Sequence, residues 1–317
     1  MKLNQLIAQY VAFQKNLGAK FESNEALLHT FSRVVGEGRQ AGNVKSHEVA
    51  AFLAGCGPVT RYWYRKYIVL RGFFRYALSR GYLSVSPLPT SVPKLPQGFK
   101  PHIYSREELR RLLDSTAFTQ TRRSRMEAHT FRALLLLLYG AGLRDGEAVS
   151  LNLEDVDLQE AVLTIRDTKF YKTRLVPLGN ELNDVMAEYA KQREKAGHSQ
   201  SGDAPFFVTR LGVRVPLELL QRNFRRLRVQ AGVRREDGAR YQPRLHDLRH
   251  AAAVHRLTAW YREGKDVQRL LPLLSTYLGH TSIACTQVYL TMTPELLHEA
   301  SKRFANYVFG EVSHDRQ

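Results

Sequence analysis

The second half of the sequence contains five side chains that together suit phosphoryl transfer on DNA. They are Arg144, Lys169, His246, Arg249 and Tyr289. A tyrosine hydroxyl can attack phosphorus, and the forked donors of an arginine match the non-bridging oxygens of a phosphate. A lysine or a histidine can transfer the protons that such a reaction needs. If these positions form one site, that site could cleave a phosphodiester without a metal ion.

Each of these residues, taken alone, also has a simpler interpretation. Arg144 lies three residues before Glu147, so the two could form an ordinary surface ion pair on one helical turn. Lys169 occupies a turn-like stretch, where a lysine is usually solvated. Tyr289 could be a core aromatic whose hydroxyl bonds a neighbour. The functional interpretation therefore depends on the residues acting as a set.

The elements expected to position these residues are mostly helices. His246 and Arg249 are three residues apart near the start of a predicted helix, which places both on one helix face. Pro272 suits the first turn of another helix, because its missing N–H costs nothing there. Apolar spacing predicts helices at 106–116, 125–141, 180–196, 216–231, 245–262, 272–278 and 281–290.

One β element interrupts these helices. Residues 162–166 and 173–177 are β-prone runs that flank a turn, and this turn would carry Lys169. The expected fold of this part is mainly α with a small antiparallel β-hairpin, which is the α+β class. The N-terminal part is expected to be an all-α helical bundle. Its predicted helices include 3–16, 24–36 and 61–80, and one more that Ser46 would cap.

The chain is strongly basic. Its formal net charge is +17 and its pI about 10.0, which favours a polyanionic partner such as DNA. The first 100 residues hold 14 Lys and Arg against 4 Glu, a net charge of +10. In the predicted helix 61–80, the expected DNA-contacting residues are Arg61, Arg65, Lys66, Arg71 and Arg75. The alternative is an ordinary amphipathic helix with a solvated basic side. Lys172 and Arg174 are further candidates for DNA contacts.

Prolines divide the chain into two units. Four of them lie between Val85 and Gly98 and favour an extended connector. The expected organisation is a helical DNA-binding domain at 1–86, a linker at 87–102 and a second domain at 103–317. A C-terminal helix is expected at 294–309, packed either on its own domain or on a neighbouring subunit.

Several other function classes find little support. No apolar run approaches the roughly 20 residues that a membrane span needs. Cys56 and Cys285 are the two cysteines, and they lack the spacing of metal ligands, so neither a zinc site nor a disulfide framework is expected. The sequence predicts a reducing cytoplasm, no membrane partner, no metal and no cofactor.

Four segments occur in an order and at separations that resemble the catalytic domain of the tyrosine recombinase (phage integrase) family. They are GAGLRDGEAVSL at 140–151, TKFYKTRLVPLG at 168–179, HDLRH at 246–250 and LGHTSIACTQVYL at 278–290. The resemblance covers about residues 103–300. Residues 1–86 more loosely resemble the family's core-DNA-binding domain.

The resemblance implies a role for each matching position. Tyr289 would attack DNA and form a 3′-phosphotyrosyl bond, and Lys169 would protonate the leaving 5′ oxygen. His246 would assist proton transfer at the tyrosine hydroxyl. His280 would hydrogen-bond a non-bridging oxygen, whereas His250 matches a frequent family residue that has no implied catalytic role.

Two arginines, Arg144 and Arg249, would clamp the phosphate, and Glu147 would support the site without doing chemistry. Departures from the family pattern are small. Asp145 replaces a usual apolar residue, and Ala148 replaces a usual leucine. Neither change removes a catalytic group, so an active enzyme is expected.

The activity that the resemblance implies is site-specific recombination of double-stranded DNA. The family uses short inverted-repeat core sites, assembles four subunits on two sites, and exchanges strands through a Holliday junction without ATP. A sister recombinase or an accessory protein is a further partner to consider. The expected setting is the nucleoid in a bacterial cytoplasm, and the expected role is integration, excision or transposition of a mobile element.

Other functions remain as alternatives. One is a recombinase that resolves chromosome or plasmid dimers, and another is relaxation of DNA like that of a type IB topoisomerase. A non-catalytic DNA-binding regulator is disfavoured because the catalytic set is complete. A metal-dependent nuclease is disfavoured because the carboxylates that it needs are not evident near the basic cluster.

Overall fold

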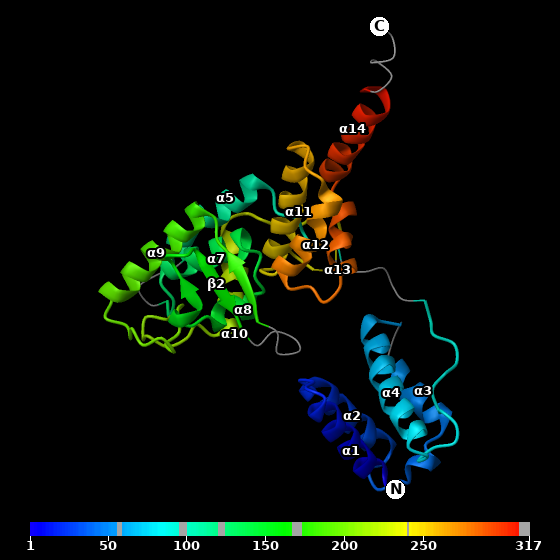
Figure 1. The fold of residues 1–317 in the computed structure, drawn as a ribbon. Helices are drawn as coiled ribbons and strands as arrows, with labels where there is room; N and C mark the ends of the chain where they lie inside the picture. Colours follow the sequence, from blue (N-terminus) through cyan, green and yellow to red (C-terminus); the bar gives the residue numbers. More distant parts are fainter. Residues whose placement is uncertain (56–58, 95–99, 120–123, 167–172, 240, 311–317) are drawn as a thin grey trace. The chain divides into compact units, whose positions relative to one another are not determined.

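The protein is described by a computed structural model that covers all residues apart from 56–58, 95–99, 120–123, 167–172, 240 and 311–317; the side chains of 303 and 306–310 are also outside the description. Internal contacts divide the chain into two units, and the division falls between residues 99 and 100. Figure 1 draws the helices and strands of both units and labels β2 and most of the helices. Lys169 and Lys172, two of the predicted functional residues, lie outside the described residues.

The first unit is an all-α bundle, as the apolar spacing predicted. Its helices are α1 (Leu3–Asn16), α2 (Glu22–Val35), α3 (Ser46–Ala54) and α4 (Arg61–Ser79), with a 3-10 turn at Ala41–Asn43. Their apolar faces meet in one core, in which Leu6, Phe31 and Phe73 are fully buried. Thr60 is the N-terminal cap of α4, because its side-chain oxygen accepts a hydrogen bond of 3.3 Å from the backbone N–H of Trp63.

Helix α4 places its basic residues in two environments. Its exposed cations are Arg61, Arg65, Arg71 and Arg75. Lys66 was expected beside them, but its side chain is buried and its ammonium donates a hydrogen bond to the carbonyl oxygen of Phe52. Burial lowers the pKa of Lys66. The expectation for Lys66 is thus corrected, since its position on the helix turns it toward α3 instead of toward solvent.

The second unit is mainly helical with one small antiparallel sheet, which confirms the predicted fold class. Its first helices are α5 (Arg106–Asp114), α6 (Thr116–Thr119), α7 (Ala128–Gly140) and α8 (Asp145–Ser150). Its strands are β1 (Val156–Asp157), β2 (Val162–Ile165) and β3 (Arg174–Pro177). Its later helices are α9 (Asn180–Lys195), α10 (Leu217–Gln230), α11 (Asp247–Arg262), α12 (Val267–Leu278), α13 (Ala284–Gln287) and α14 (Pro294–Gly310), with 3-10 turns at Leu153–Asp155 and Val288–Thr291.

The sheet has the order β1–β2–β3, with both pairs antiparallel. Leu163 in the central strand lies opposite Val156 on one side and opposite Val176 on the other. The side chains of Leu163 and Val176 are fully buried, so this face of the sheet belongs to the core. Strand β1 was not predicted, because a strand of two residues carries no alternation that a sequence pattern could reveal.

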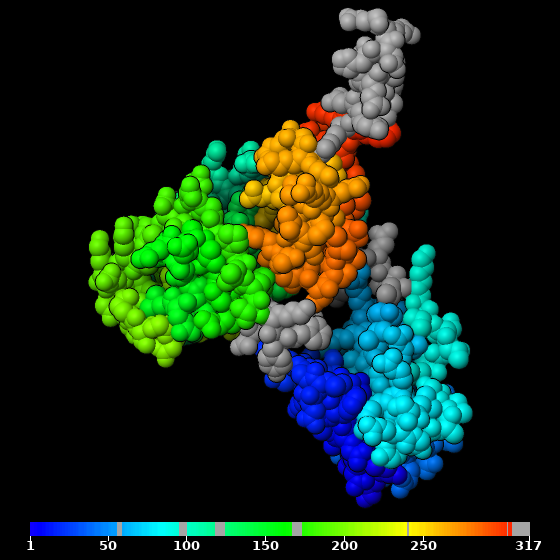
Figure 2. All heavy atoms as spheres, viewed as in Figure 1, coloured from blue at the N-terminus to red at the C-terminus, as the bar shows by residue number. Residues whose placement is uncertain are grey.

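Helix α7 forms the centre of the second unit. Its side chains Phe131, Leu134 and Leu137 are fully buried, and each contributes about 1.5–3 kcal/mol by leaving water. The helix packs against α9 and α11, and α11 in turn packs against α12 and α14. In the space-filling view, the orange part that includes α12 and α13 lies directly against the green part of the same unit (Figure 2). Within the described ranges, no helix combines the length and the apolarity that crossing a bilayer requires.

Two helices near the C-terminus differ from their predictions. Helix α12 begins at Val267 instead of Pro272, because Asp266 caps it by accepting a hydrogen bond from the backbone N–H of Arg269 at 3.1 Å. Pro272 therefore lies inside the helix. The predicted helix 281–290 is instead a short helix, α13, followed by the 3-10 turn that carries Tyr289.

Candidate active site

Among the predicted cations that the structure describes, Arg249 is the most deeply buried. It lies in the first turn of α11, and its side chain is 2 % exposed. Its guanidinium donates to the carbonyl oxygen of Gly142 at 2.7 Å and to that of Leu278 at 2.5 Å. Gly142 has a φ of +60°, and a Cβ there would lie 2.8 Å from the Leu278 side chain. This glycine therefore allows the turn after α7 to approach both Arg249 and the end of α12.

Arg144 reaches the same end of α12 from a different element. It lies directly before α8, and one of its terminal nitrogens donates to Glu147 at 2.6 Å. The other donates to the carbonyl oxygen of Gly279 at 2.8 Å. The simple ion pair with Glu147 is thus present, as the alternative interpretation held. The same arginine nevertheless joins a site assembled from distant parts of the chain.

Glu147 receives a second arginine, Arg174, from β3. Two guanidinium nitrogens of Arg174 donate to the two carboxylate oxygens at 3.0 and 2.7 Å, and its Nε donates to the carbonyl oxygen of Tyr277. Arg174 was expected to contact DNA, but it is committed to this carboxylate inside the site, because β3 ends beside α12. Burial alone would raise the pKa of Glu147, but hydrogen bonds from Arg174 and from the backbone of Arg144 lower it to about 2.

The lowered pKa of Glu147 predicts a stability that depends on pH. The folded-state pKa lies below the ordinary value of 4.5, so the carboxylate stabilises the fold above that value and this contribution is lost as the pH falls toward 2. We expect Glu147→Gln to lower the free energy of unfolding by on the order of 2–3 kcal/mol at pH 7 and by about half as much at pH 3. Urea unfolding at both pH values measures this difference.

The exposed Glu154 offers a matched control, because Glu154→Gln removes a carboxylate from the same unit. This control variant should unfold at nearly the wild-type urea concentration. An equal loss of stability for Glu147→Gln at the two pH values would contradict the prediction that the ionised form of this carboxylate stabilises the fold.

Tyr289 lies in the 3-10 turn after α13, and its side chain is 2 % exposed. It packs with Val254, Leu278 and Leu296 in a small apolar cluster. Burial raises the pKa of the phenol, whereas the positive charge and the hydrogen bond of Arg249 oppose this rise. The side chain is therefore both a core aromatic and the neighbour of a phosphate-clamping candidate.

The hydroxyl of Tyr289 lies 3.1 Å from Nδ1 of His250, and the two ring centroids are 5.6 Å apart. His246 was expected to serve this hydroxyl. It lies one turn earlier, 3.8 Å from the carboxylate of Asp145, and its ring packs edge-on against His250 at 5.1 Å. Spacing of four residues places His246 and His250 on one helix face, but spacing alone does not show which ring reaches the tyrosine.

Asp145, a departure from the family pattern, has two polar neighbours. One carboxylate oxygen lies near His246, and the other accepts a hydrogen bond from Gln221 at 2.9 Å. The carboxylate raises the pKa of His246, but the larger effect of burial lowers it overall.

His280 follows the left-handed glycine that ends α12. Gly279 has a φ of +66°, and this conformation turns the next residue back toward the site. Nδ1 of His280 lies 2.7 Å from the hydroxyl of Thr286, and its ring centroid is 6.1 Å from that of Tyr289. Burial lowers the pKa of His280 to about 4, and the nearby Arg249 and Arg144 add to this effect.

The structure thus gathers most of the predicted catalytic residues. The gathered side chains are Arg144, Glu147, His246, Arg249, His280 and Tyr289, joined by Arg174 and His250. Lys169, the predicted acid, lies outside the described residues. In the part of the chain that the structure describes, no three His, Cys, Asp or Glu side chains gather as a metal site. The arrangement can hold an anion between two arginines, with a tyrosine hydroxyl beside one of them.

Residues 105–295 match the model of the phage integrase family. The chain belongs to the phage integrase family. The relatives agree with this membership: the putative integrase/recombinase y4rB of Sinorhizobium fredii is 35 % identical over 305 residues, which cover 94 % of this chain and 96 % of that protein. The tyrosine recombinase XerA of Thermococcus kodakarensis is 30 % identical over 266 residues, 83 % of each chain. This integrase-family chain is therefore a site-specific tyrosine recombinase, as the motifs predicted.

Solved structures of integrases share the fold. The Tn1549 transposon integrase in complex with a circular intermediate DNA superposes with a TM-score of 0.71 and 18 % identity, over 96 % of this chain and 100 % of that chain. A lambda integrase dimer bound to a COC′ core site superposes with a TM-score of 0.65 and 15 % identity, over 92 % of this chain and 78 % of that chain.

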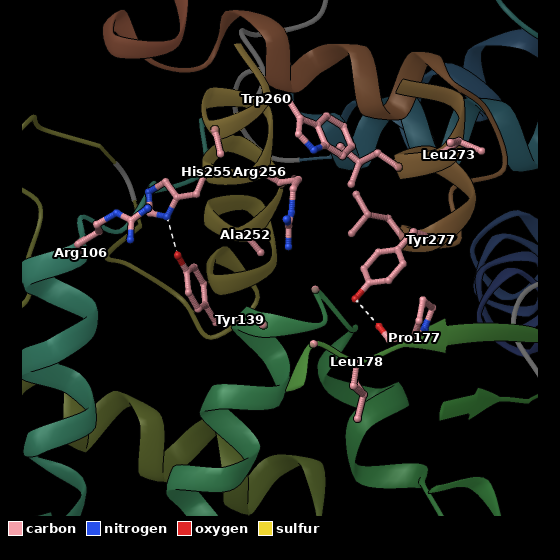
Figure 3. A pocket seen from close by; sticks show the side chains of 17 residues that line it. Arg106, Tyr139, Pro177, Leu178, Ala252, His255, Arg256, Trp260, Leu273 and Tyr277 are labelled. Atoms are coloured by element: carbon pink, nitrogen blue, oxygen red, sulfur yellow. Dashed lines mark hydrogen bonds between the residues drawn. The ribbon is translucent and has the colours of Figure 1, made fainter. Parts of the chain in front are cut away.

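A cavity lies next to Gly142 and Leu278, the residues whose carbonyl oxygens hold Arg249. This cavity of about 640 Å³ is lined by α7, α11, α12 and the end of β3, and its lining includes Gly142 and Leu278. Figure 3 shows two hydrogen bonds at its wall, from Tyr277 to the carbonyl oxygen of Pro177 at 3.3 Å and between Tyr139 and His255 at 2.8 Å. Residues whose main chain holds Arg249 therefore also line this cavity.

Proposed function

We propose that this recombinase cuts and rejoins DNA with Tyr289 as nucleophile. The hydroxyl oxygen attacks the scissile phosphorus, passes its proton to solvent water, and forms a 3′-phosphotyrosyl bond while the bond from phosphorus to the 5′ oxygen breaks. Lys169 gives the leaving oxygen a proton. In the second half of the reaction, a 5′ hydroxyl attacks the phosphotyrosine and releases the enzyme. The phosphotyrosyl bond retains the energy of the broken phosphodiester.

The observation that carries this proposal is the convergence of Arg144 and Arg249 beside Tyr289. The arginines come from two separate elements, yet both bond main-chain carbonyls at the end of α12. Two guanidinium groups held in this way can meet the negative charge that grows on a phosphorane without rearranging first. His280, at the same turn, would donate to a non-bridging oxygen, and Glu147 would keep Arg144 in place.

A suicide substrate tests the proposal. The protein is incubated in EDTA with a nicked duplex that carries its target site, so that the short 5′ fragment diffuses away after cleavage. We expect a DNA adduct that resists denaturing electrophoresis and is attached through a 3′ phosphate. Absence of an adduct on a verified site would refute the proposed reaction. Joining of two sites, as opposed to relaxation of one plasmid, would separate a recombinase from a topoisomerase.

The exposed face of α4 is proposed to contact DNA phosphates. Four arginines lie on it, and the first 100 residues carry a net charge of +10. We expect the double variant Arg61→Ala/Arg65→Ala to weaken binding on all DNA sequences and to make the slope of log affinity against log salt less steep by about 2. Fluorescence anisotropy at several salt concentrations measures this slope. The double variant Lys191→Ala/Lys195→Ala on α9 is the charge-matched control. An unchanged slope for the α4 variant would remove this face from the interface.

The DNA partner is proposed to be a duplex with short inverted-repeat core sites, bound by four copies of the chain. A solved lambda integrase tetramer is bound to a Holliday junction, which supports such an assembly. Helix α14 begins on its own unit, with Leu296 fully buried and Arg262 paired with Glu295 and Glu299. Farther along α14, Phe304 is 68 % exposed, and this apolar side chain is proposed to contact a neighbouring copy.

The biological role is proposed to be integration, excision or transposition of a mobile element in a bacterial cytoplasm, at the nucleoid. The likeness to y4rB and the shared fold of a transposon integrase support this role. The second candidate is the resolution of chromosome or plasmid dimers, and the 30 % identity to a Xer recombinase favours it. A sister recombinase or an accessory protein could assist either role.

A further inference from the structure

We propose that His250 is a further catalytic residue, which accepts the hydrogen bond of the Tyr289 hydroxyl and orients that hydroxyl for attack. This inference rests on the proposed function, because it assigns a partner to the nucleophile of that reaction. It moves the tyrosine contact from His246, where the family resemblance had placed it, to the residue one helical turn farther along α11.

Geometry separates the two histidines. Nδ1 of His250 lies 3.1 Å from the Tyr289 oxygen, within hydrogen-bond range. His246 directs its Nδ1 toward Asp145 and packs against the ring of His250. Arg249, between the two in sequence, contributes only N–H donors to the hydroxyl, so it cannot accept the phenol's hydrogen. Among the described residues, His250 is therefore the side chain that lies within hydrogen-bond distance of the hydroxyl and can accept its hydrogen.

The protonation state of His250 suits an acceptor. Burial lowers the pKa of its imidazole to about 4, and His246 nearby adds to this effect. The ring is therefore neutral at pH 7, and its Nδ1 lone pair is free to accept. A base this weak does not deprotonate a buried phenol in the resting enzyme, because burial also raises the pKa of Tyr289. Its function is thus to fix the direction of the O–H bond and, with it, the lone pair that attacks phosphorus.

The packing of both residues holds this hydrogen bond in place. Tyr289 is fixed by an apolar cluster, and His250 is fixed on one side by the edge-on ring of His246. When the hydroxyl rotates about its C–O bond, its hydrogen and lone pairs point in directions that do not allow attack. An acceptor in a fixed position restricts this rotation to the productive direction. The hydrogen bond ends when the hydroxyl proton passes to solvent water during cleavage, and it forms again when ligation releases the tyrosine and the hydroxyl takes up a proton.

Two substitutions distinguish an acceptor from a proton carrier. The Oδ1 atom of asparagine is attached to Cγ, as Nδ1 of histidine is, so His250→Asn keeps an acceptor in nearly the same place but cannot take up a proton. Leucine at this position fills similar space and accepts nothing. We expect single-turnover cleavage to slow about tenfold or more for His250→Leu, and to stay within about threefold of wild type for His250→Asn.

The assay uses the full-length protein on the nicked suicide substrate, in parallel with a substrate whose leaving 5′ oxygen is replaced by sulfur. A sulfur leaving group needs no acid, so the sulfur substrate should rescue Lys169→Met but should not rescue His250→Leu. Equal DNA binding and equal melting temperature for wild type and His250→Leu show that the defect is not one of folding.

Each outcome decides between specific claims. Wild-type protein that forms no adduct refutes the proposed function, and this inference with it. A wild-type rate for His250→Leu refutes this inference alone. A defect in His250→Asn as large as that in His250→Leu also overturns it, because the ring would then be needed for more than accepting a hydrogen bond. Rescue of His250→Leu by the sulfur substrate would place His250 at the leaving group instead.

Discussion

Tyr289→Phe is expected to bind its DNA site with wild-type affinity and to form no covalent adduct. The substitution removes one oxygen from a buried side chain, and the ring keeps its packing against Leu278 and Leu296. The nucleophile itself is lost, so the rate of adduct formation should fall below detection, at least about 10⁴-fold below wild type. Denaturing electrophoresis of a labelled suicide substrate measures the adduct, and a mobility shift measures binding.

A matched control is Tyr277→Phe, on the neighbouring helix α12. Its hydroxyl donates to the carbonyl oxygen of Pro177 at 3.3 Å, at the wall of the cavity (Figure 3). This variant should form adducts at close to the wild-type rate. A covalent adduct that persists in Tyr289→Phe would require another nucleophile and would refute the assigned role.

Arg249→Lys is expected to slow single-turnover cleavage by about 10²–10³-fold while leaving the protein folded. A lysine keeps the positive charge but loses the planar fork that can engage two phosphate oxygens. Loss of one preorganised donor to a transition-state oxygen costs about that much in other enzymes. Lysine is the informative choice, because alanine would leave the buried carbonyls of Gly142 and Leu278 without their donors.

Arg256→Lys provides the comparison, since Arg256 is an exposed arginine on the same helix. The Arg256→Lys variant should cleave the DNA substrate at the wild-type rate. If Arg249→Lys retained more than a tenth of the wild-type rate with an unchanged melting temperature, the bidentate clamp would not be part of the reaction.

Much of the fold follows from local patterns. The helices of the first unit appear as apolar residues every three or four positions, and the hairpin appears as two β-prone runs around a turn. Pro272 misled the prediction for α12, because the stronger local signal was the capping residue Asp266, six residues before this proline. Propensity of a single residue is a weak guide when a cap and a buried face favour a longer helix.

The site was less accessible to local reasoning. Arg144, Arg249 and Tyr289 stood out through motif order, but the pairing of Arg174 with Glu147 joins residues 27 apart through the packing of a strand against a helix. Lys66 reads as one more cation in a basic helix, and only the position of α3 shows that it is buried. His250 and His246 share a helix face, so the identity of the tyrosine's neighbour depended on where the turn after α13 lies.

The three arginines of the site carry more positive charge than their one shared carboxylate can balance. Glu147 pairs with Arg144 and Arg174, whereas Arg249 is held by main-chain carbonyls, and burial together with Arg144 lowers its pKa to about 10. Among the described side chains, no carboxylate forms an ion pair with Arg249, so the fold tolerates an unmatched cation in its interior. If the proposed function holds, the scissile phosphate would supply the missing counter-ion, so that the DNA would complete the ionic structure of the protein that cuts it.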